Sequence, residues 1–78
     1  MVKVKFFGVL TNMMPEKNEE GFWITDGKGK TIRELLDSSP LRETSVRYTV
    51  YVNNERRDTS YILEDSDTLT VLPLLAGG

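Results

Sequence analysis

The sequence predicts a single α+β domain in which a mixed sheet of four to five strands packs on one main helix. Apolar and polar residues alternate near both ends of the chain and in its middle, which is the period of half-buried strands. One segment, residues 31–36, combines a helix-start motif with helical spacing of its apolar residues. Because 78 residues suffice for one small domain only, we expect that domain to span residues 1–73, followed by a tail at 74–78.

The first expected strand begins at Val2. Apolar Val2, Val4 and Phe6 recur at every second position, and we expect the strand to run to Leu10. Residues 11–21 are polar and contain several turn formers, so a loop or a loose hairpin connection is expected there.

A second strand and the helix follow. Residues 22–25 are rich in strand formers. Thr31 and Glu34 are spaced as a capping box, in which each side chain bonds the other residue's amide. An apolar stripe then continues over about two helical turns and consists of Ile32, Leu35 and Leu36. Pro40 predicts the end of the helix, because proline disfavours helical geometry in the residue before it.

The second half of the chain contains the clearest alternation, which predicts a strand over residues 46–52. We expect a short edge strand within residues 55–60 and one helical turn at residues 61–63, packed against the core. The last strand is expected over residues 68–73.

This order of elements is that of a β-grasp (ubiquitin-like) fold, with the apolar first and last strands in the middle of the sheet. A ferredoxin-like order would need a second full helix, which no remaining segment can supply.

Composition argues against several classes of protein. The chain has no cysteine and no histidine, so the usual metal ligands and the usual general base are missing, and we expect neither a metal site, a cofactor nor an enzyme. A net charge of -2 gives no footprint for nucleic acid. The N-terminus does not resemble a signal peptide and no apolar run approaches a membrane span, so we expect a cytoplasmic protein. Acidic residues before the last strand either steer the tail to a basic partner or form an ordinary solvated loop.

The final five residues, Leu74-Leu75-Ala76-Gly77-Gly78, follow the last strand without a polar stop. Glycine has no Cβ, so a Gly-Gly end can pass through a narrow channel to the active site of another enzyme. Five extended residues reach roughly 17 Å from the domain. We therefore expect the Gly78 carboxylate to be the reacting group, with Leu74, Leu75 and Ala76 contacting the partner.

The segment 65–78 resembles the C-terminus of the MoaD/ThiS ubiquitin-like sulfur-carrier family, which has an acidic turn, an apolar strand and Pro-x-Val/Leu-Ala/Ser-Gly-Gly. Residues 2–10 are similar to the family's first strand, residues 31–36 to its helix, and residues 50–55 to its Val-x-Val-Asn segment. Pro73 favours the branch of the molybdopterin synthase small subunit. Residues 11–30 match nothing in the family. Ser66 stands where the family usually has glycine, so we expect this turn to avoid positive φ.

The resemblance implies a carrier that is itself a substrate, at most the small subunit of a molybdopterin synthase-like complex. An adenylating enzyme of the MoeB/ThiF type would activate Gly78, with Gly77 beside it, and a sulfur donor would form a thiocarboxylate. The acceptor would be an enzyme such as a molybdopterin synthase large subunit. A ubiquitin-like modifier conjugated through Gly78 and a carrier for thiamin or cysteine synthesis remain alternatives. A third is a plain β-grasp interaction domain with a passive tail.

The expected sheet leaves one face uncovered by the helix. An apolar patch with a basic rim on such a face suits partner docking. The residues expected there are Lys5, Phe7, Arg47, Tyr51 and Leu72.

Overall fold

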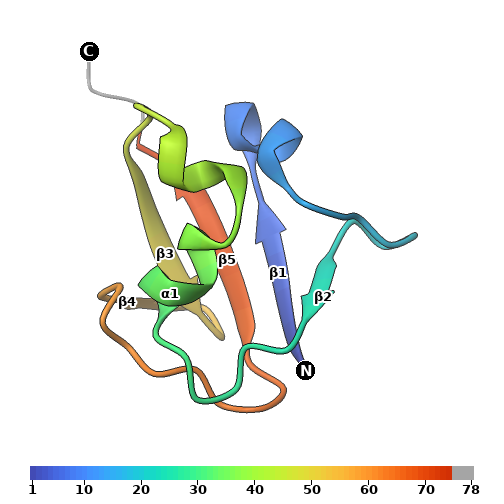
Figure 1. Cartoon of the computed structure of the whole chain (residues 1–78), viewed down its shortest axis with the longest axis vertical. Coiled ribbons are helices and arrows are strands. Elements are labelled where there is room, and N and C mark those ends of the chain that lie inside the picture. Colours follow the sequence, from blue (N-terminus) through green and yellow to red (C-terminus); the bar gives the residue numbers. More distant parts are fainter. Residues whose placement is uncertain (75–78) are drawn as a thin grey trace.

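A computed structural model describes residues 1–74 of the chain. Its elements, in chain order, are β1 (Val2–Phe6), the 3-10 helix η1 (Gly8–Met13), β2 (Trp23–Thr25), α1 (Ile32–Asp37), the 3-10 helix η2 (Pro40–Glu43), β3 (Tyr48–Val52), β4 (Glu55–Arg57) and β5 (Thr68–Pro73). The five strands form one sheet in the order β2-β1-β5-β3-β4. β1 and β5 are parallel and the other neighbours are antiparallel. α1 lies across one face of this mixed sheet (Figure 1), as the sequence predicted.

The core lies between α1 and the sheet. Alternate residues of β1, β3 and β5 point toward the helix, and the apolar stripe of α1 meets them. The fully buried side chains that fill this layer include Val2, Val4, Phe6, Ile32, Leu35, Leu36, Leu69 and Val71. The predicted alternation therefore corresponds to the two faces of the sheet, one packed and one open.

The helix begins where its capping box was predicted. Thr31 Oγ1 accepts a hydrogen bond from the Glu34 amide at 3.1 Å, and Glu34 Oε1 accepts one from the Thr31 amide at 3.0 Å. The helix ends at Asp37, shortly before Pro40. Pro40 then opens the short helix η2, which the sequence did not predict.

The first strand is shorter than predicted. It ends at Phe6, and the chain turns at Gly8, whose φ of 60° is in the left-handed region. The turn leads into η1, which places Leu10 in the core with no exposed surface. The prediction of a strand to Leu10 and of a loop from residue 11 was therefore wrong at this point, because the left-handed backbone at Gly8 ends the extended chain and η1 follows it.

The expected helical turn at residues 61–63 is also wrong. Ile62 instead forms an isolated antiparallel bridge with Thr31, and Leu63 donates its amide to the Lys30 carbonyl at 2.8 Å. This extended backbone buries Leu63 and leaves Ile62 59% exposed. Residues 61–63 satisfy their backbone groups by pairing with the segment before α1, so a helical turn has no advantage there.

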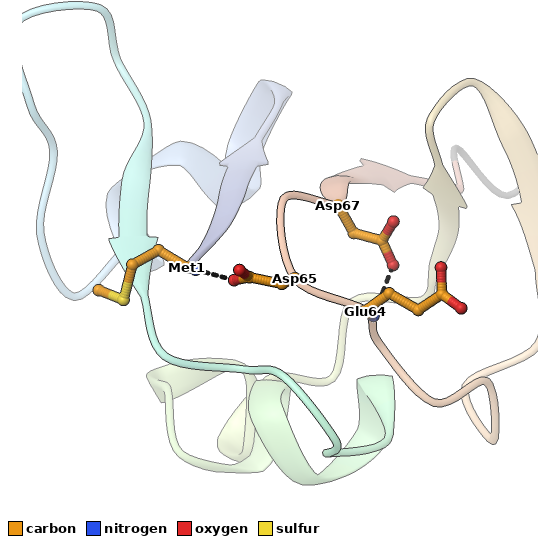
Figure 2. Close-up of polar contacts among 4 residues, drawn as sticks. All are labelled: Met1, Glu64, Asp65 and Asp67. Atoms are coloured by element: carbon orange, nitrogen blue, oxygen red, sulfur yellow. Dashed lines mark hydrogen bonds and ion pairs between the residues drawn. The ribbon is translucent and has the colours of Figure 1, made fainter.

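The remaining predictions differ less. β4 and β5 lie within the expected ranges, and β3 begins at Tyr48, two residues later than expected. Ser66 has a φ of 71°, so the expectation that its turn avoids positive φ was wrong. The Asp67 carboxylate accepts a hydrogen bond from the Glu64 amide at 2.8 Å and closes this tight turn (Figure 2). Ser66 lies inside the closed turn, and its backbone adopts the left-handed conformation there.

Candidate functional site

The end of β5 is the part of the predicted site that the structure describes best. β5 lies in the middle of the sheet, between β1 and β3. Pro73 pairs with Tyr48 of β3, and the Leu74 amide then donates to the Arg47 carbonyl at 2.8 Å. The Leu74 side chain is 47% exposed. The sheet therefore holds the chain as far as Leu74.

The reacting end of the predicted site is Gly77-Gly78. These two residues, together with Leu75 and Ala76, lie outside the described residues. Their expected roles stay predictions.

A glycine adjoins the end of β5. The last β1–β5 pair joins Phe6 to Val71, so Gly8 and Pro73 each lie two residues beyond it. A Cβ placed on Gly8 would be 3.0 Å from Pro73 Cγ. Sequence patterns alone could not connect Gly8 with the tail, because this contact depends on the register between the two strands.

The open face of the sheet carries the residues that the sequence placed there. Pairing puts Lys5 and Tyr51 on either side of Thr70, and Leu72 pairs with Thr49. Tyr51 and Leu72 are half-buried, whereas Phe7 is 38% exposed. Arg47 is exposed beside the point where the chain leaves the sheet. This face thus combines threonines in the middle of the sheet with the apolar surfaces of Tyr51, Leu72 and Phe7, and it has positive charge at Lys5 and Arg47.

Lys3 and Phe22 also lie on this face, although the sequence pattern did not predict them there. Lys5 Nζ lies over the rings of both Phe7 and Phe22, at 5.4 and 5.2 Å from their centroids. Lys3 Nζ lies over the Phe22 ring at 5.5 Å. We call Lys3, Lys5, Phe7 and Phe22 the basic–aromatic cluster. Phe22 precedes β2, and the pairing of Lys3 with Ile24 brings it over β1.

The lysines of the basic–aromatic cluster are held by aromatic rings and not by carboxylates. Among residues 1–74 the ion pairs join other groups: Met1 with Asp65, Arg42 with Glu43 and Arg57 with Glu55. An ammonium over a ring keeps its charge and hydrogen-bond donors available on the solvent side. The cluster therefore presents uncompensated positive charge next to apolar surface.

The acidic turn before β5 lies far from the end of that strand. β5 has six residues, so its two ends are about 20 Å apart. Asp65 instead bonds the Met1 ammonium (Figure 2), which lowers its pKa by hydrogen bonding and by charge attraction. These bonds give the acidic turn a structural role at the end of the sheet opposite Leu74. Because the turn lies so far from Leu74, its position does not support the interpretation that its acidic residues steer the tail.

Residues 1–74 contain neither a candidate metal cluster nor a candidate membrane-spanning helix. Histidine, cysteine and acidic side chains do not gather there in any group of three or more suited to a metal ion. No helix of this part of the chain is long and apolar enough to cross a membrane.

Comparison with known proteins gives the fold. No protein-family model matches the chain, and no curated protein does. The crystal structure of SAMP1 from Haloferax volcanii is similar, with a TM-score of 0.65 over 99% of this chain and 98% of that one. The two sequences are 20% identical, so the similarity concerns the fold. The chain has the β-grasp fold of the ubiquitin-like kind.

Proposed function

We propose that this chain is a ubiquitin-like sulfur carrier whose reacting group is the carboxylate of Gly78. The observation that carries the proposal is the exit of the chain from the middle of a β-grasp sheet. The sheet holds Leu74 through the Arg47 carbonyl, and four residues ending in Gly77-Gly78 follow. A protein that serves as a substrate needs both parts. The partner enzyme recognises the folded domain, and the narrow C-terminal end enters its active site.

The proposed reaction begins with activation by an adenylating enzyme of the MoeB/ThiF type. A carboxylate oxygen of Gly78 attacks the α-phosphorus of ATP, and pyrophosphate leaves. Sulfide-level sulfur (HS⁻) supplied by a donor then attacks the acyl carbon, the C–O bond to AMP breaks and AMP leaves. Loss of the proton from sulfur gives the thiocarboxylate of Gly78. The carrier contributes position and no catalytic side chain, because the ATP site and the sulfur donor belong to its partners.

We propose molybdopterin synthesis as the destination of the sulfur. The acceptor would then be an enzyme like the large subunit of molybdopterin synthase. The support is the resemblance of the C-terminal segment to that branch, including Pro73.

The number of residues beyond Leu74 limits where a partner can bind. Because Leu74 is held by the sheet, the four residues beyond it can span at most about 14 Å. The ATP site of the activating enzyme must therefore lie within about 14 Å of Leu74 when the two proteins dock.

The open face of the sheet is the surface we propose for docking. It adjoins Leu74 through Arg47, Leu72 and Phe7, and Tyr51 continues it toward β4. The basic–aromatic cluster extends the same face over β1 to β2. We propose a partner surface with an apolar centre and carboxylates around it, because these groups complement exposed aromatic rings and unpaired lysines.

The intact mass of the protein from its native host tests the carrier function. A fraction about 16 Da heavier is expected, since sulfur replaces one oxygen of Gly78. The control is a variant that lacks Gly78, which must lack the part of this fraction that is due to sulfur, because oxidised methionine adds about the same mass to both proteins. Isopeptide-linked adducts without any thiocarboxylate would show a protein modifier instead and would contradict the proposal.

A further inference from the structure

The contact between Gly8 and Pro73 is the feature from which a further inference follows. Gly8 begins η1 with a φ of 60°. Its missing side chain leaves room for the Pro73 ring, since a Cβ at this position would be 3.0 Å from Pro73 Cγ. Carbon atoms normally pack about 3.5–4.0 Å apart. Any other residue at position 8 would therefore strain its own backbone and displace the proline ring.

The same stretch of chain is held on its other side by β3. Pro73 pairs with Tyr48, and Leu74 donates to the Arg47 carbonyl. The N–H groups of a strand point to its two neighbours in turn, so the N–H that Pro73 lacks would face β1. β1 has already ended there, at Phe6, and the ladder loses no bond. Proline also fixes φ near −65°, which removes one degree of freedom at the exit.

We propose that Gly8 and Pro73 form a seat that sets the direction in which the chain leaves the sheet at Leu74, and that Gly8 is thereby a positioning residue for activation of Gly78. This inference rests on the proposed function. A change of direction of about 20° at Leu74 displaces the end of four extended residues by about 5 Å. Errors of about 1 Å in the position of reacting groups can lower rates about 100-fold.

The seat makes a prediction about kinetic constants that a purely structural role for Gly8 does not. Docking depends on the open sheet face, so Gly8→Ala should leave KM for the carrier within about twofold. The rate constant of adenylation, measured by ATP–pyrophosphate exchange, should fall at least about tenfold. In addition, hydrogen exchange at the Leu74 amide should become at least about tenfold faster, because displacement of Pro73 weakens the bond to Arg47.

The matched control is Gly29→Ala. Gly29 also has a positive φ, of 82°, but its Cβ would meet no atom within 4 Å. Both substitutions place an alanine at a positive φ, and only Gly8→Ala disturbs Pro73. If Gly8→Ala fails to fold, Pro73→Ala replaces it, with Pro15→Ala in the exposed loop as its control.

Four results decide the inference. A slower adenylation together with faster Leu74 exchange, in Gly8→Ala but not in Gly29→Ala, supports it. Equal behaviour of the two variants overturns it, as does faster Leu74 exchange without any change in adenylation. If the wild-type protein is not adenylated by the MoeB/ThiF-type enzyme of its host, the proposed function fails, and positioning for activation is overturned with it. Leu74 exchange in Gly8→Ala then still decides whether the seat itself exists.

Discussion

The side-chain amide of Asn53 donates a hydrogen bond to the Asp67 carboxylate at 2.9 Å and joins the end of β3 to the start of β5. Asn53 Oδ1 also accepts the Thr68 amide at 3.0 Å. The other oxygen of Asp67 accepts the Glu64 amide (Figure 2). Both oxygens of this buried carboxylate therefore accept a hydrogen bond. Two segments that the sequence analysis treated separately, the Val-x-Val-Asn segment and the acidic turn, are therefore one structural unit.

Asn53→Ala should lower the free energy of unfolding by about 2–3 kcal/mol, because it leaves the buried Asp67 carboxylate without this donor. The control is Asn54→Ala. Asn54 also has a positive φ but makes no side-chain hydrogen bond among the described residues, so this variant measures the backbone effect alone. Urea unfolding of both proteins checks the prediction. Equal losses would mean that the Asn53–Asp67 bond contributes nothing to stability.

The capping box should make stability depend on pH. The pKa of Glu34 lies below its ordinary value of 4.5, first because its carboxylate accepts the Thr31 amide and then because of the Thr31 hydroxyl. The pKa of Glu34 is thus lower in the folded than in the unfolded protein. The stabilisation that the capping box contributes is therefore complete at pH values above the ordinary pKa, and it is lost as the pH falls through the lowered pKa. Glu34→Gln should flatten the fall in stability in that acidic range. Urea titrations at several pH values compare the two proteins, and parallel curves would exclude Glu34 as a cause.

The two faces of β3 should respond differently to truncation. Val50 is 2% exposed and faces α1, whereas Tyr51 is half-buried on the open face. Val50→Ala should cost about 2 kcal/mol of stability through lost burial and a cavity. Tyr51→Ala should change stability much less and should weaken binding to the adenylating enzyme. Thermal unfolding and calorimetric titration measure both effects. A Tyr51→Ala protein that unfolds would contradict the assignment of Tyr51 to the open face.

Local patterns predicted the parts of this molecule that depend on neighbouring residues. The Thr31–Glu34 spacing gave the helix start, and strict alternation gave the limits of β5 and the face on which Tyr51 lies. Features that depend on pairing between distant strands were missed. Phe22 reaches Lys5 only because β2 pairs with β1 in one particular register. Segments that are close in sequence can also lie far apart in the structure. The acidic turn directly precedes β5, but it lies at the end of that strand opposite Leu74.

Lys5 should contribute to the rate of association with the adenylating enzyme more than to folding. Its ammonium lies over two rings and is not neutralised by a carboxylate within residues 1–74, so it is available to acidic groups of the partner. Lys5→Gln should slow association and reduce its dependence on salt concentration. The control is Lys30→Gln, at an exposed lysine before α1. Stopped-flow association at several salt concentrations tests this, and equal salt slopes for the two variants would contradict it.

Gly77→Val should separate docking from chemistry. Binding to the adenylating enzyme depends on the open sheet face, which this substitution leaves unchanged, so the dissociation constant should stay close to that of the wild type. A branched side chain restricts φ and widens the chain where it must pass to the ATP site, so ATP–pyrophosphate exchange should fall at least about 100-fold. Gly77→Ala adds a single methyl group and should have an intermediate rate. Calorimetry gives the affinity and isotope exchange gives the rate for each protein. If Gly77→Val is adenylated at the wild-type rate, the C-terminal end does not enter the ATP site and the sulfur-carrier function is wrong.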